Sequence, residues 1–261
     1  MKIVTVSLDQ IWEDKESNIK QIQRLMLDIS QVNPDLVVFP EMTLTGFTMN
    51  AETMSEDLSQ SSTIGFFSKL AVEYKTAIAF GVILRTKVKP TNNLVVVSRD
   101  GEVLGRYEKI HPFSYSGETD YYSKGEKTIS FALNGFTVGL TICYDLRFPE
   151  LYQSLSKKCD AIINIANWPA RRVEDWSLLL HARALENQSY IIGVNRTGVD
   201  GKGLEYAKSS SVIGPTGTDV KSHAMSDIVD IYEIDKESVD SYRKSFPVKN
   251  DRRISLYKEI L

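Results

Sequence analysis

The sequence predicts a single α/β domain that contains a mixed sheet. Strand-sized apolar segments alternate with segments of helical periodicity along almost the whole chain. Two pairs of strand-sized segments are joined by Asp100-Gly101 and Asn134-Gly135, dipeptides that favour the tight turns between antiparallel strands. No linker rich in Gly, Ser or Pro and no repeat divides the 261 residues. We therefore expect one domain over residues 1–261, with both parallel and antiparallel strand pairs.

The first half of the chain begins with a strand, a helix and a second strand. Residues 3–8 show the alternation of a strand, and apolar residues three to four positions apart indicate a helix over 19–29. Residues 35–40 are a short apolar run ended by proline, which is typical of a strand covered on both faces. The same patterns predict a helix at 66–74 and strands at 77–84, 93–97 and 102–107.

The second half continues the alternation. Residues 128–133 and 136–143 form the second predicted hairpin, and Pro149 suits the first position of a helix over 149–156. Further on, the patterns predict a long amphipathic helix at 173–188 and strands at 160–166, 190–195, 209–213 and 228–234. Residues 246–261 have too little periodicity to build a core of their own. We expect this C-terminal tail to pack on another subunit.

Composition excludes several classes of function. The 31 basic and 34 acidic residues give a net charge of -3, so no positive field attracts nucleic acid. Met1 leads directly into a strand-like segment without the features of a secretory signal, and no apolar stretch approaches the ~20 residues that span a bilayer. We expect a cytoplasmic protein. Two cysteines, Cys143 and Cys159, are too few for a disulfide framework or a cysteine-rich zinc site.

Cys143 is a candidate nucleophile because of where it stands in the chain. It ends a predicted strand, and the polar turn at 144–150 leads directly into a helix. Such a bend can hold a nucleophile, and the nearby backbone N–H groups and helix terminus should favour its thiolate form. The alternative is a small buried cysteine without chemistry. We favour that interpretation for Cys159, which has no such bend.

A nucleophilic cysteine usually needs a base. Among the three histidines only His111 is placed to act in a cysteine–histidine enzyme, because His181 lies in a predicted helix and His223 in a polar loop. A buried carboxylate can serve instead, and Glu41 directly follows a predicted buried strand. Lys109 also follows a predicted strand. Taken singly, Glu41 and Lys109 are equally consistent with exposed surface residues.

Taken together, Glu41, Lys109 and Cys143 indicate an active site. Each ends a predicted strand, and ligands bind at the carboxyl ends of strands in α/β sheets. The three side chains would supply a base, a cation for a developing oxyanion and a nucleophile. The alternative from a different class is a noncatalytic ligand-binding protein, which would not need this combination.

The segments around these residues strongly resemble the three motifs of the nitrilase superfamily of carbon-nitrogen hydrolases. In order, they are Phe39-Pro40-Glu41-Met42, Tyr107-Glu108-Lys109-Ile110-His111 and Ile142-Cys143-Tyr144-Asp145-Leu146-Arg147-Phe148-Pro149-Glu150. The resemblance covers almost the whole chain. It implies a four-layer α-β-β-α sandwich, an oligomer built on at least a homodimer, and a catalytic set of Glu41, Lys109 and Cys143. Glu118 matches the second glutamate that many members place beside these three.

A further resemblance concerns the substrate. Residues 167–172 and 183–188 are similar to segments of the omega-amidase branch, which implies hydrolysis of the terminal amide of 2-oxoglutaramate or 2-oxosuccinamate. Such a substrate carries a remote carboxylate, which Arg171 or Arg172 could bind with a planar guanidinium, although both could equally be solvated. Phe113, Tyr115 and Trp168 are candidate apolar walls. We expect Asp145, Arg147 and Glu150 to form a charge network that fixes the turn after Cys143.

The expected mechanism passes through a thioester. Glu41 takes the proton of the Cys143 thiol, and Lys109 and the backbone N–H of Tyr144 stabilise the oxyanion. Glu41 then protonates the departing ammonia and activates the water that hydrolyses the thioester. This chemistry needs neither a metal nor an organic cofactor. The alternatives are a deaminated-glutathione amidase, a carbamoyl-amine hydrolase, a true nitrilase, and a glutaminase-like subunit that supplies ammonia to a synthetase.

Overall fold

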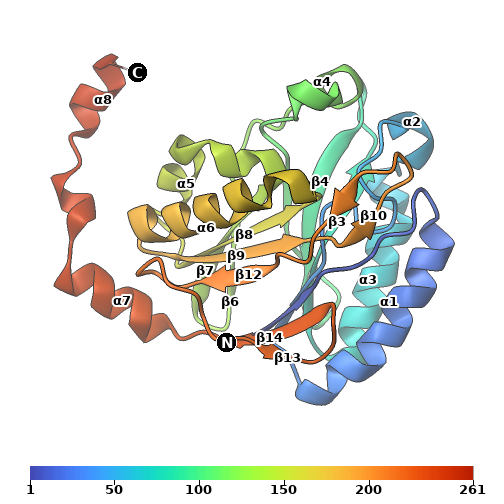
Figure 1. Ribbon diagram of the computed structural model, residues 1–261, viewed down its shortest axis with the longest axis horizontal. Coiled ribbons are helices and arrows are strands. Elements are labelled where there is room, and N and C mark those ends of the chain that lie inside the picture. Colours follow the sequence, from blue (N-terminus) through green and yellow to red (C-terminus); the bar gives the residue numbers. More distant parts are fainter. Residues whose placement is uncertain (261) are drawn as a thin grey trace.

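Two mixed sheets pack face to face, and helices cover their outer faces (Figure 1). The structure is a computed structural model that describes residues 1–260. The arrangement is the four-layer α-β-β-α sandwich that the resemblance implies. The sequence patterns alone predict one mixed sheet, because hairpin and crossover signals show how neighbouring strands pair and not how many sheets they build.

The first sheet has seven strands. Its order is β13 (His223–Ala224), β14 (Val229–Glu233), β1 (Lys2–Val6), β2 (Leu36–Val38), β3 (Ala77–Leu84), β4 (Thr91–Val97) and β5 (Val103–Glu108). Strands β1, β2 and β3 are parallel, whereas β4 and β5 continue the sheet as an antiparallel meander. On the other side, β14 pairs antiparallel with β1. The N-terminal strand therefore lies inside the sheet, beside a strand from near the end of the chain.

The second sheet has five strands around a parallel centre. Its order is β12 (Ser211–Ile213), β9 (Tyr190–Asn195), β8 (Ala161–Ala166), β7 (Phe136–Ile142) and β6 (Ser130–Leu133). Strands β7, β8 and β9 are parallel, and β6 and β12 are antiparallel edge strands. A separate pair, β10 (Gly198–Val199) and β11 (Glu205–Tyr206), follows β9.

Helices α1 (Lys15–Ile29) and α3 (Ser62–Tyr74) cover the first sheet, and α5 (Pro149–Leu155) and α6 (Val173–Asn187) cover the second. Side chains cap two of them, because Asp14 accepts from the backbone N–H of Ser17 and Ser61 from that of Ile64. Four further helices are α2 (Ala51–Met54), α4 (Glu118–Tyr121), α7 (Lys236–Ser245) and α8 (Ile254–Ile260). None of the helices within residues 1–260 is long and apolar enough to cross a membrane.

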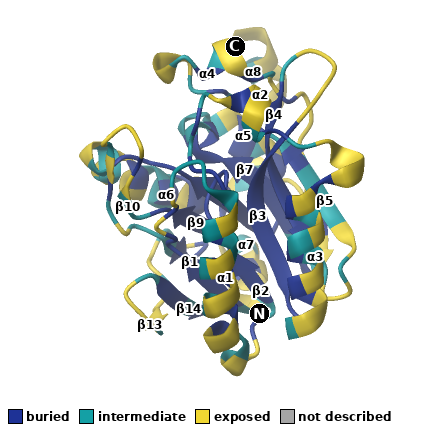
Figure 2. Cartoon of the chain, turned by 90° about the vertical axis from the view of Figure 1, so that its right-hand side faces the viewer, coloured by how far each residue is buried: buried dark blue, intermediate teal, exposed yellow. Residues whose placement is uncertain are grey.

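The strands of the first sheet are apolar on both faces because each face is covered. Ile3 belongs to the core between the two sheets, whereas Val4 and Val6 belong to the core beneath α1 and α3. The same alternation separates Leu36 and Val38 from Val37. Figure 2 shows the buried strands behind α1 and α3, whose outer faces are exposed.

Most predicted elements are confirmed with ends that move by a few residues. The exceptions are short or polar: β10, β11, β13, α2 and α4 are too short for a pattern, and α7 and α8 have no predicted counterpart. The sequence does contain a start signal for α7, since the Asp235 side chain accepts from the Ser238 backbone N–H.

The C-terminal tail lies beside α5 (Figure 1). Lys249 Nζ donates to the Ser156 carbonyl at 2.8 Å, and Arg252 Nη2 donates to Gln153 Oε1. Residues 254–260, which form α8, include no buried residue. The beginning of the tail thus contacts its own domain, and α8 buries nothing within the described chain.

Candidate active site

Glu41 stands at the carboxyl end of β2, as predicted, and is fully buried. The chain bends sharply after it, because Met42 has a φ of 47°. The bend presses against β3 so closely that a Cβ on Gly81 would lie 2.1 Å from the Met42 nitrogen. Any other residue at position 81 would therefore displace the segment that presents Glu41.

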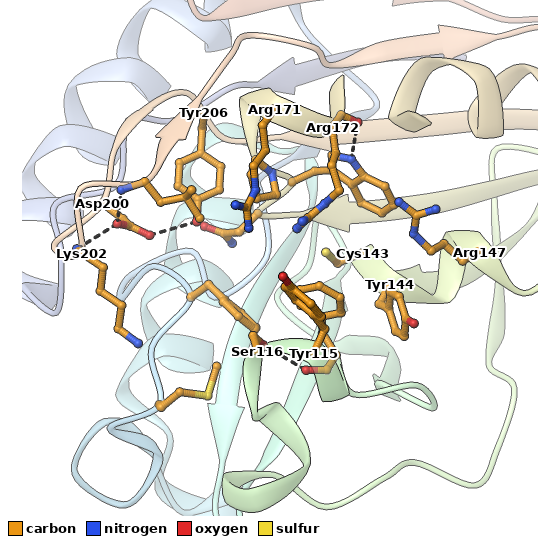
Figure 3. A pocket seen from close by; sticks show the side chains of 17 residues that line it. Tyr115, Ser116, Cys143, Tyr144, Arg147, Arg171, Arg172, Asp200, Lys202 and Tyr206 are labelled. Carbon is orange, nitrogen blue, oxygen red and sulfur yellow. Dashed lines mark hydrogen bonds between the residues drawn. The ribbon is translucent and has the colours of Figure 1, made fainter. Parts of the chain in front are cut away.

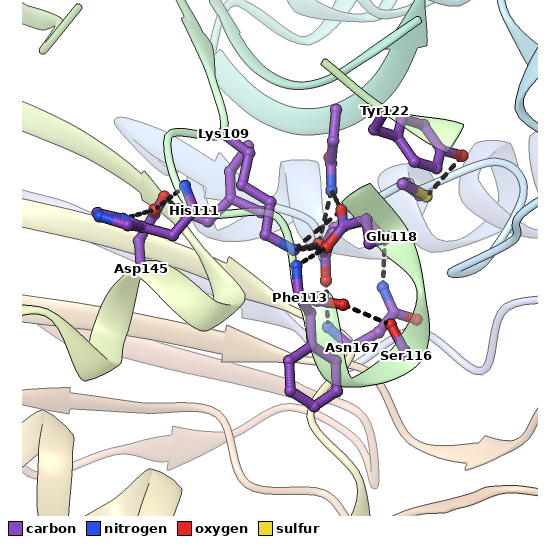
Figure 4. A network of polar contacts seen from close by, with 12 residues as sticks. Lys109, His111, Phe113, Ser116, Glu118, Tyr122, Asp145 and Asn167 are labelled. Carbon is purple, nitrogen blue, oxygen red and sulfur yellow. Dashed lines mark hydrogen bonds and ion pairs between the residues drawn. The ribbon is translucent and has the colours of Figure 1, made fainter. Parts of the chain in front are cut away.

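Lys109, at the end of β5, joins Glu41 to Glu118. Its Nζ lies 3.0 Å from Oε1 of Glu41, and 3.1 and 2.8 Å from Oε1 and Oε2 of Glu118 (Figure 4). All three side chains are buried, with exposed fractions of 0% or 1%. Burial acts to lower the Lys109 pKa, but the Glu118 and Glu41 carboxylates outweigh it and hold the pKa well above the usual range. Lys109 is therefore a charged ammonium.

Hydrogen bonds distinguish the two glutamates. The Glu118 oxygens accept four hydrogen bonds, namely two from Lys109 Nζ, one from Asn92 Nδ2 and one from the Phe113 backbone N–H. Burial raises the Glu118 pKa while Lys109 opposes that increase. On Glu41, Oε1 accepts from Lys109 and Asn92, but Oε2 accepts only the Asn167 backbone N–H at 2.8 Å within the described chain. Of the two glutamates in this part of the chain, Glu41 thus retains a free acceptor position.

Cys143 occupies the bend between β7 and a short 3₁₀ turn over Cys143–Arg147. Its φ of 47° is uncommon for a residue other than glycine and marks a strained elbow. The side chain is 9% exposed and lines a cavity. The predicted bend is therefore confirmed, and it places the largely buried Cys143 in the wall of the cavity.

The expected thiolate is not confirmed. Burial raises the Cys143 pKa well above its usual value, and the Glu41 carboxylate adds to the increase while Lys109 opposes it. The residues next to Cys143 in the sequence reveal the backbone N–H groups and the helix terminus, but not the two carboxylates packed around the thiol. The direction of this pKa shift favours the neutral thiol of Cys143.

Asp145 fixes the elbow against the segment that carries Lys109. Its Oδ2 accepts from the Tyr107 hydroxyl at 2.8 Å and the Ile142 backbone N–H at 2.9 Å. Its Oδ1 lies 2.8 Å from His111 Nδ1 and also accepts the His111 backbone N–H at 3.0 Å. Asp145 therefore ties β5 of the first sheet to β7 of the second.

The prediction that Arg147 and Glu150 join Asp145 in a charge network is wrong. Arg147 pairs with Asp175 at 2.6 Å and lies over the Trp168 ring, and Glu150 is exposed and forms no ion pair within residues 1–260. His111 stacks on Phe148 with 3.7 Å between ring centroids and bonds to Asp145, so its ring serves the elbow. The His111 ring is thus engaged by Asp145 and Phe148, which does not favour the alternative of a cysteine–histidine enzyme.

A cavity of about 230 Å³ opens above Cys143 (Figure 3). Its predicted lining residues are all present, and they are Phe113, Tyr115, Tyr144, Trp168, Arg171 and Arg172. The lining that the sequence does not predict comes from two loops and from β11, and comprises Phe47, Met49, Asp200, Lys202, Leu204 and Tyr206, among others. The β10–β11 pair is too short to leave a sequence pattern, and this wall therefore has no signal in the sequence.

The cavity carries more positive than negative charge. Arg147, Arg171, Arg172 and Lys202 line it, against the single carboxylate of Asp200. That carboxylate is already occupied by the Tyr206 hydroxyl and two backbone N–H groups. Burial, followed by the charges of Arg171 and Arg147, lowers the Arg172 pKa. A bound anion would relieve this repulsion.

Arg172 is the better placed of the two predicted arginines. It is half-buried, whereas Arg171 is exposed, and its guanidinium lies 5.3 Å from the Phe113 ring centroid. Neither forms an ion pair within the described residues. The loop around them is rigid, because Trp168 Nε1 donates to the Arg172 carbonyl at 2.7 Å and Asn195 bonds to both backbone groups of Trp168.

The remaining cysteine lies apart from this site. Cys159 is fully buried, and burial and the neighbouring Asp160 raise its pKa to about 11. It has no elbow and lines no part of the cavity. Within residues 1–260 no group of three or more His, Cys, Asp or Glu side chains is arranged to hold a metal ion.

Comparison with known proteins agrees with this geometry. A model of the carbon-nitrogen hydrolase family matches residues 2–244. Omega-amidase YafV of Yersinia enterocolitica is 32% identical over 254 residues, which cover 96% of each chain. The 2-oxoglutaramate amidase of Paenarthrobacter nicotinovorans is also 32% identical, over 93% of this chain and 85% of its own. A CN-hydrolase superfamily protein of Xanthomonas campestris, which has an arsenic adduct in its active site, is 30% identical with a TM-score of 0.90 over 97% of both chains.

Proposed function

The chain belongs to the carbon-nitrogen hydrolase family, and from that premise we propose that it hydrolyses the terminal amide of a small 2-oxo dicarboxylic acid. The products are the free acid and ammonia, and 2-oxoglutaramate and 2-oxosuccinamate are the expected substrates. The relatives named above are omega-amidases and a 2-oxoglutaramate amidase. The observation that carries the proposal is a small cavity that is lined by Cys143 and by three arginines, in a site that also holds the buried carboxylate of Glu41.

The reaction begins on Cys143. As Sγ attacks the amide carbonyl, the thiol proton passes to Glu41, and a tetrahedral oxyanion forms. Collapse of the oxyanion breaks the C–N bond, Glu41 returns the proton to the leaving nitrogen, and ammonia departs from a thioester. Glu41 then removes a proton from water, whose oxygen attacks the thioester. As the C–S bond breaks, Glu41 returns this proton to the departing sulfur, which regenerates the thiol and releases the acid product.

Glu41 suits the role of base better than Glu118. A base needs a free lone pair, and Oε2 of Glu41 has one beside the Asn167 N–H, whereas four donors occupy the two oxygens of Glu118. The raised Cys143 pKa makes such a base necessary, since little thiolate exists at neutral pH. We assign Glu118 the role of holding Lys109.

Lys109 and the backbone N–H of Tyr144 are proposed to stabilise the oxyanion. The ammonium is charged and buried, where electrostatic stabilisation is stronger than in water. Tyr144 follows Cys143 directly in the elbow and lines the cavity. One such donor contributes roughly 3 kcal/mol of transition-state stabilisation in other enzymes.

Arg172 is proposed to bind the remote carboxylate of the substrate. Its half-buried guanidinium lacks an acidic partner within the described chain and lies next to Arg171 and Arg147. Phe113, Tyr115 and Trp168 form the walls that surround the carbon chain. A carboxylate here gains a charge-assisted contact, whereas a neutral amide leaves the cluster uncompensated.

Ammonia release from a panel of substrates tests the proposal. The panel contains 2-oxoglutaramate, neutral amides of equal length, glutamine, carbamoyl amines and nitriles. We expect the highest kcat/KM for the 2-oxo monoamides and poor turnover of nitriles. Faster turnover of a carbamoyl amine or of glutamine would contradict this proposal and favour a carbamoyl-amine hydrolase or an ammonia-supplying subunit.

We also propose a cytoplasmic homodimer or higher homo-oligomer that needs no metal or organic cofactor. A reaction that depends on a reduced thiol suits the cytoplasm. The tail exposes Phe246, Val248 and Ile254, whose exposed fractions range from 36% to 57%. A second copy of this chain would cover them, in keeping with the expectation that residues 246–261 pack on another subunit.

A further inference from the structure

Two neighbouring asparagines of β4 use their side-chain amides differently. Both are buried, but their side chains point to opposite faces of the strand. Asn93 is fully satisfied: its Nδ2 donates to the carbonyl and hydroxyl of Thr91, and its Oδ1 accepts from Arg106 Nη1 at 3.0 Å. This is the usual behaviour of a buried structural asparagine.

Asn92 leaves half of its amide without a partner. Its Nδ2 donates to Oε1 of Glu41 at 2.7 Å and to Oε1 of Glu118 at 3.1 Å. Its Oδ1 is buried and accepts no hydrogen bond within residues 1–260. The Asn92 backbone carbonyl accepts the Lys109 N–H at 2.9 Å. Asn92 therefore contacts the two glutamates and the lysine of the site.

The orientation of this amide follows from charge. A flipped amide would direct the Oδ1 lone pairs at two carboxylate oxygens, which is repulsive. In the observed orientation Nδ2 donates to both carboxylates, and Oδ1, which accepts no hydrogen bond within residues 1–260, points away from them. A buried acceptor without a partner destabilises the folded state. The contribution of Asn92 to stability therefore does not explain why an asparagine stands at this position.

We propose that Asn92 is a positioning residue of the hydrolysis: its single amide nitrogen fixes Oε1 of Glu41 and of Glu118, and so reserves Oε2 of Glu41 for the thiol proton. The inference rests on the proposed role of Glu41. Asn92 therefore contributes to the geometry of the base, because it holds one oxygen and leaves the other free.

The other charged and titratable groups around Glu41 are Lys109, Glu118, Cys143 and Tyr122. Lys109 Nζ is the second donor to Oε1 of Glu41, at 3.0 Å. Burial together with Glu118 and Glu41 raises the pKa of Tyr122 well above its usual value, so this phenol stays neutral. Removing Asn92 leaves Lys109 and Glu118 in place, and Oε1 of Glu41 then keeps one of its two donors.

The test compares Asn92→Ala and the nearly isosteric Asn92→Asp with Asn93→Ala, a matched control on the same strand. In both Asn92 variants kcat should fall about 10- to 100-fold with little change in KM, because a displaced base slows proton transfer and leaves the cavity unchanged. The loss should be larger in Asn92→Asp, which places a third carboxylate beside Glu41 and Glu118. Asn93→Ala should lower thermal stability and leave kcat unchanged. Unchanged kcat in the Asn92 variants, an equal loss of kcat in Asn93→Ala, or failure of both Asn92 variants to fold would overturn the proposal.

A second measurement does not depend on the substrate. The rate of Cys143 alkylation by iodoacetamide is followed against pH by mass spectrometry of the Cys143 peptide, which separates it from Cys159. In wild type, base-assisted alkylation should begin at neutral pH. In Asn92→Ala it should begin only at higher pH, whereas in Asn93→Ala it should begin at neutral pH as in wild type. Identical profiles in wild type and Asn92→Ala would contradict the positioning role. If wild-type protein releases no ammonia from the panel but the alkylation profiles differ as expected, the proposed substrate fails and the role of Asn92 stands.

Discussion

The Asn167 backbone N–H donates to Oε2 of Glu41 at 2.8 Å, between residues 126 positions apart in the sequence. Glu41 follows β2 of the first sheet, and Asn167 follows β8 of the second. The Asn167 side chain also donates to the Glu41 carbonyl at 2.7 Å. The loop that continues to Arg172 therefore holds the base as well as the cavity wall, and changes in this loop should affect proton transfer as well as substrate binding.

Cys143→Ala should abolish ammonia release while the protein stays folded. The nucleophile has no substitute, and the replacement is small. Cys159→Ala is the matched control, since it also removes a buried thiol but one that lines no part of the cavity. Steady-state ammonia release checks both variants. Wild-type turnover by Cys143→Ala, or acylation found on Cys159, would be incompatible with the mechanism.

Glu41→Gln should retain the shape of the site and lose proton transfer. The acylation rate in a single turnover should fall by about 100-fold or more, which is the size of general-base contributions in other enzymes. Glu150→Gln, on the exposed helix that follows the elbow, is the control and should acylate at the wild-type rate. Acylation of Glu41→Gln at the wild-type rate would show that Glu41 is not the general base.

Lys109→Ala should unfold more easily as well as lose activity. It leaves Glu41 and Glu118 buried without their cation, and breaking a buried pair in this way costs roughly 3–5 kcal/mol. The loss should be smaller at pH 5 than at pH 8, because burial raises the Glu118 pKa and protonation of Glu118 removes one of the uncompensated charges. In wild type, the raised Lys109 pKa makes stability depend on pH at the alkaline end. The stabilisation by charged Lys109 is fully present below the ordinary lysine pKa and is lost only as pH rises through the higher pKa of Lys109 in the folded protein. Urea denaturation at several pH values measures both trends, and an equal loss at pH 5 and pH 8 would contradict the assignment.

Arg172→Ala should reduce the preference for a charged substrate. Losing a charge-assisted contact of about 1.5–3 kcal/mol lowers kcat/KM for 2-oxoglutaramate roughly 10- to 150-fold, mainly through KM, and leaves a neutral amide nearly unchanged. Arg171→Ala tests the exposed neighbour in the same loop. It should have a smaller effect on the ratio of kcat/KM for 2-oxoglutaramate to kcat/KM for the neutral amide. If neither variant changes the ratio, the carboxylate lies elsewhere in the cavity.

The sequence predicts the residues at strand ends better than those within strands. Glu41, Lys109 and Cys143 each follow a recognisable strand, so the order of strands and polar residues along the chain is enough to predict their common location. Asn92 has no comparable signal, because it belongs to the polar run 91–93 just before the apolar part of the predicted strand 93–97 and looks like an ordinary turn residue. Its role becomes visible only when β2, β4 and β5 bring Glu41, Asn92 and Lys109 together.

The protonation state of Cys143 shows a second limit. A cysteine at a strand-to-helix bend suggests a thiolate when only local dipoles are considered. The pKa depends equally on charges that arrive from Glu41 and Glu118, which are 102 and 25 positions away in the sequence. Local chemistry can be read from neighbouring residues, whereas desolvation and remote charges require the folded arrangement.

The pairing of β1 with β14 has a consequence during protein synthesis. Lys2–Val6 are made well before their partners Val229–Glu233, which emerge from the ribosome roughly 10–50 s later at a rate of about 5–20 residues per second. Throughout that interval the nascent chain carries an apolar strand with one row of N–H and C=O groups open to any other strand. Chaperones that shield strand edges should therefore bind ribosome-attached chains that end before Val229 and release those that extend past Ile234, whose carbonyl accepts from the Met1 amine.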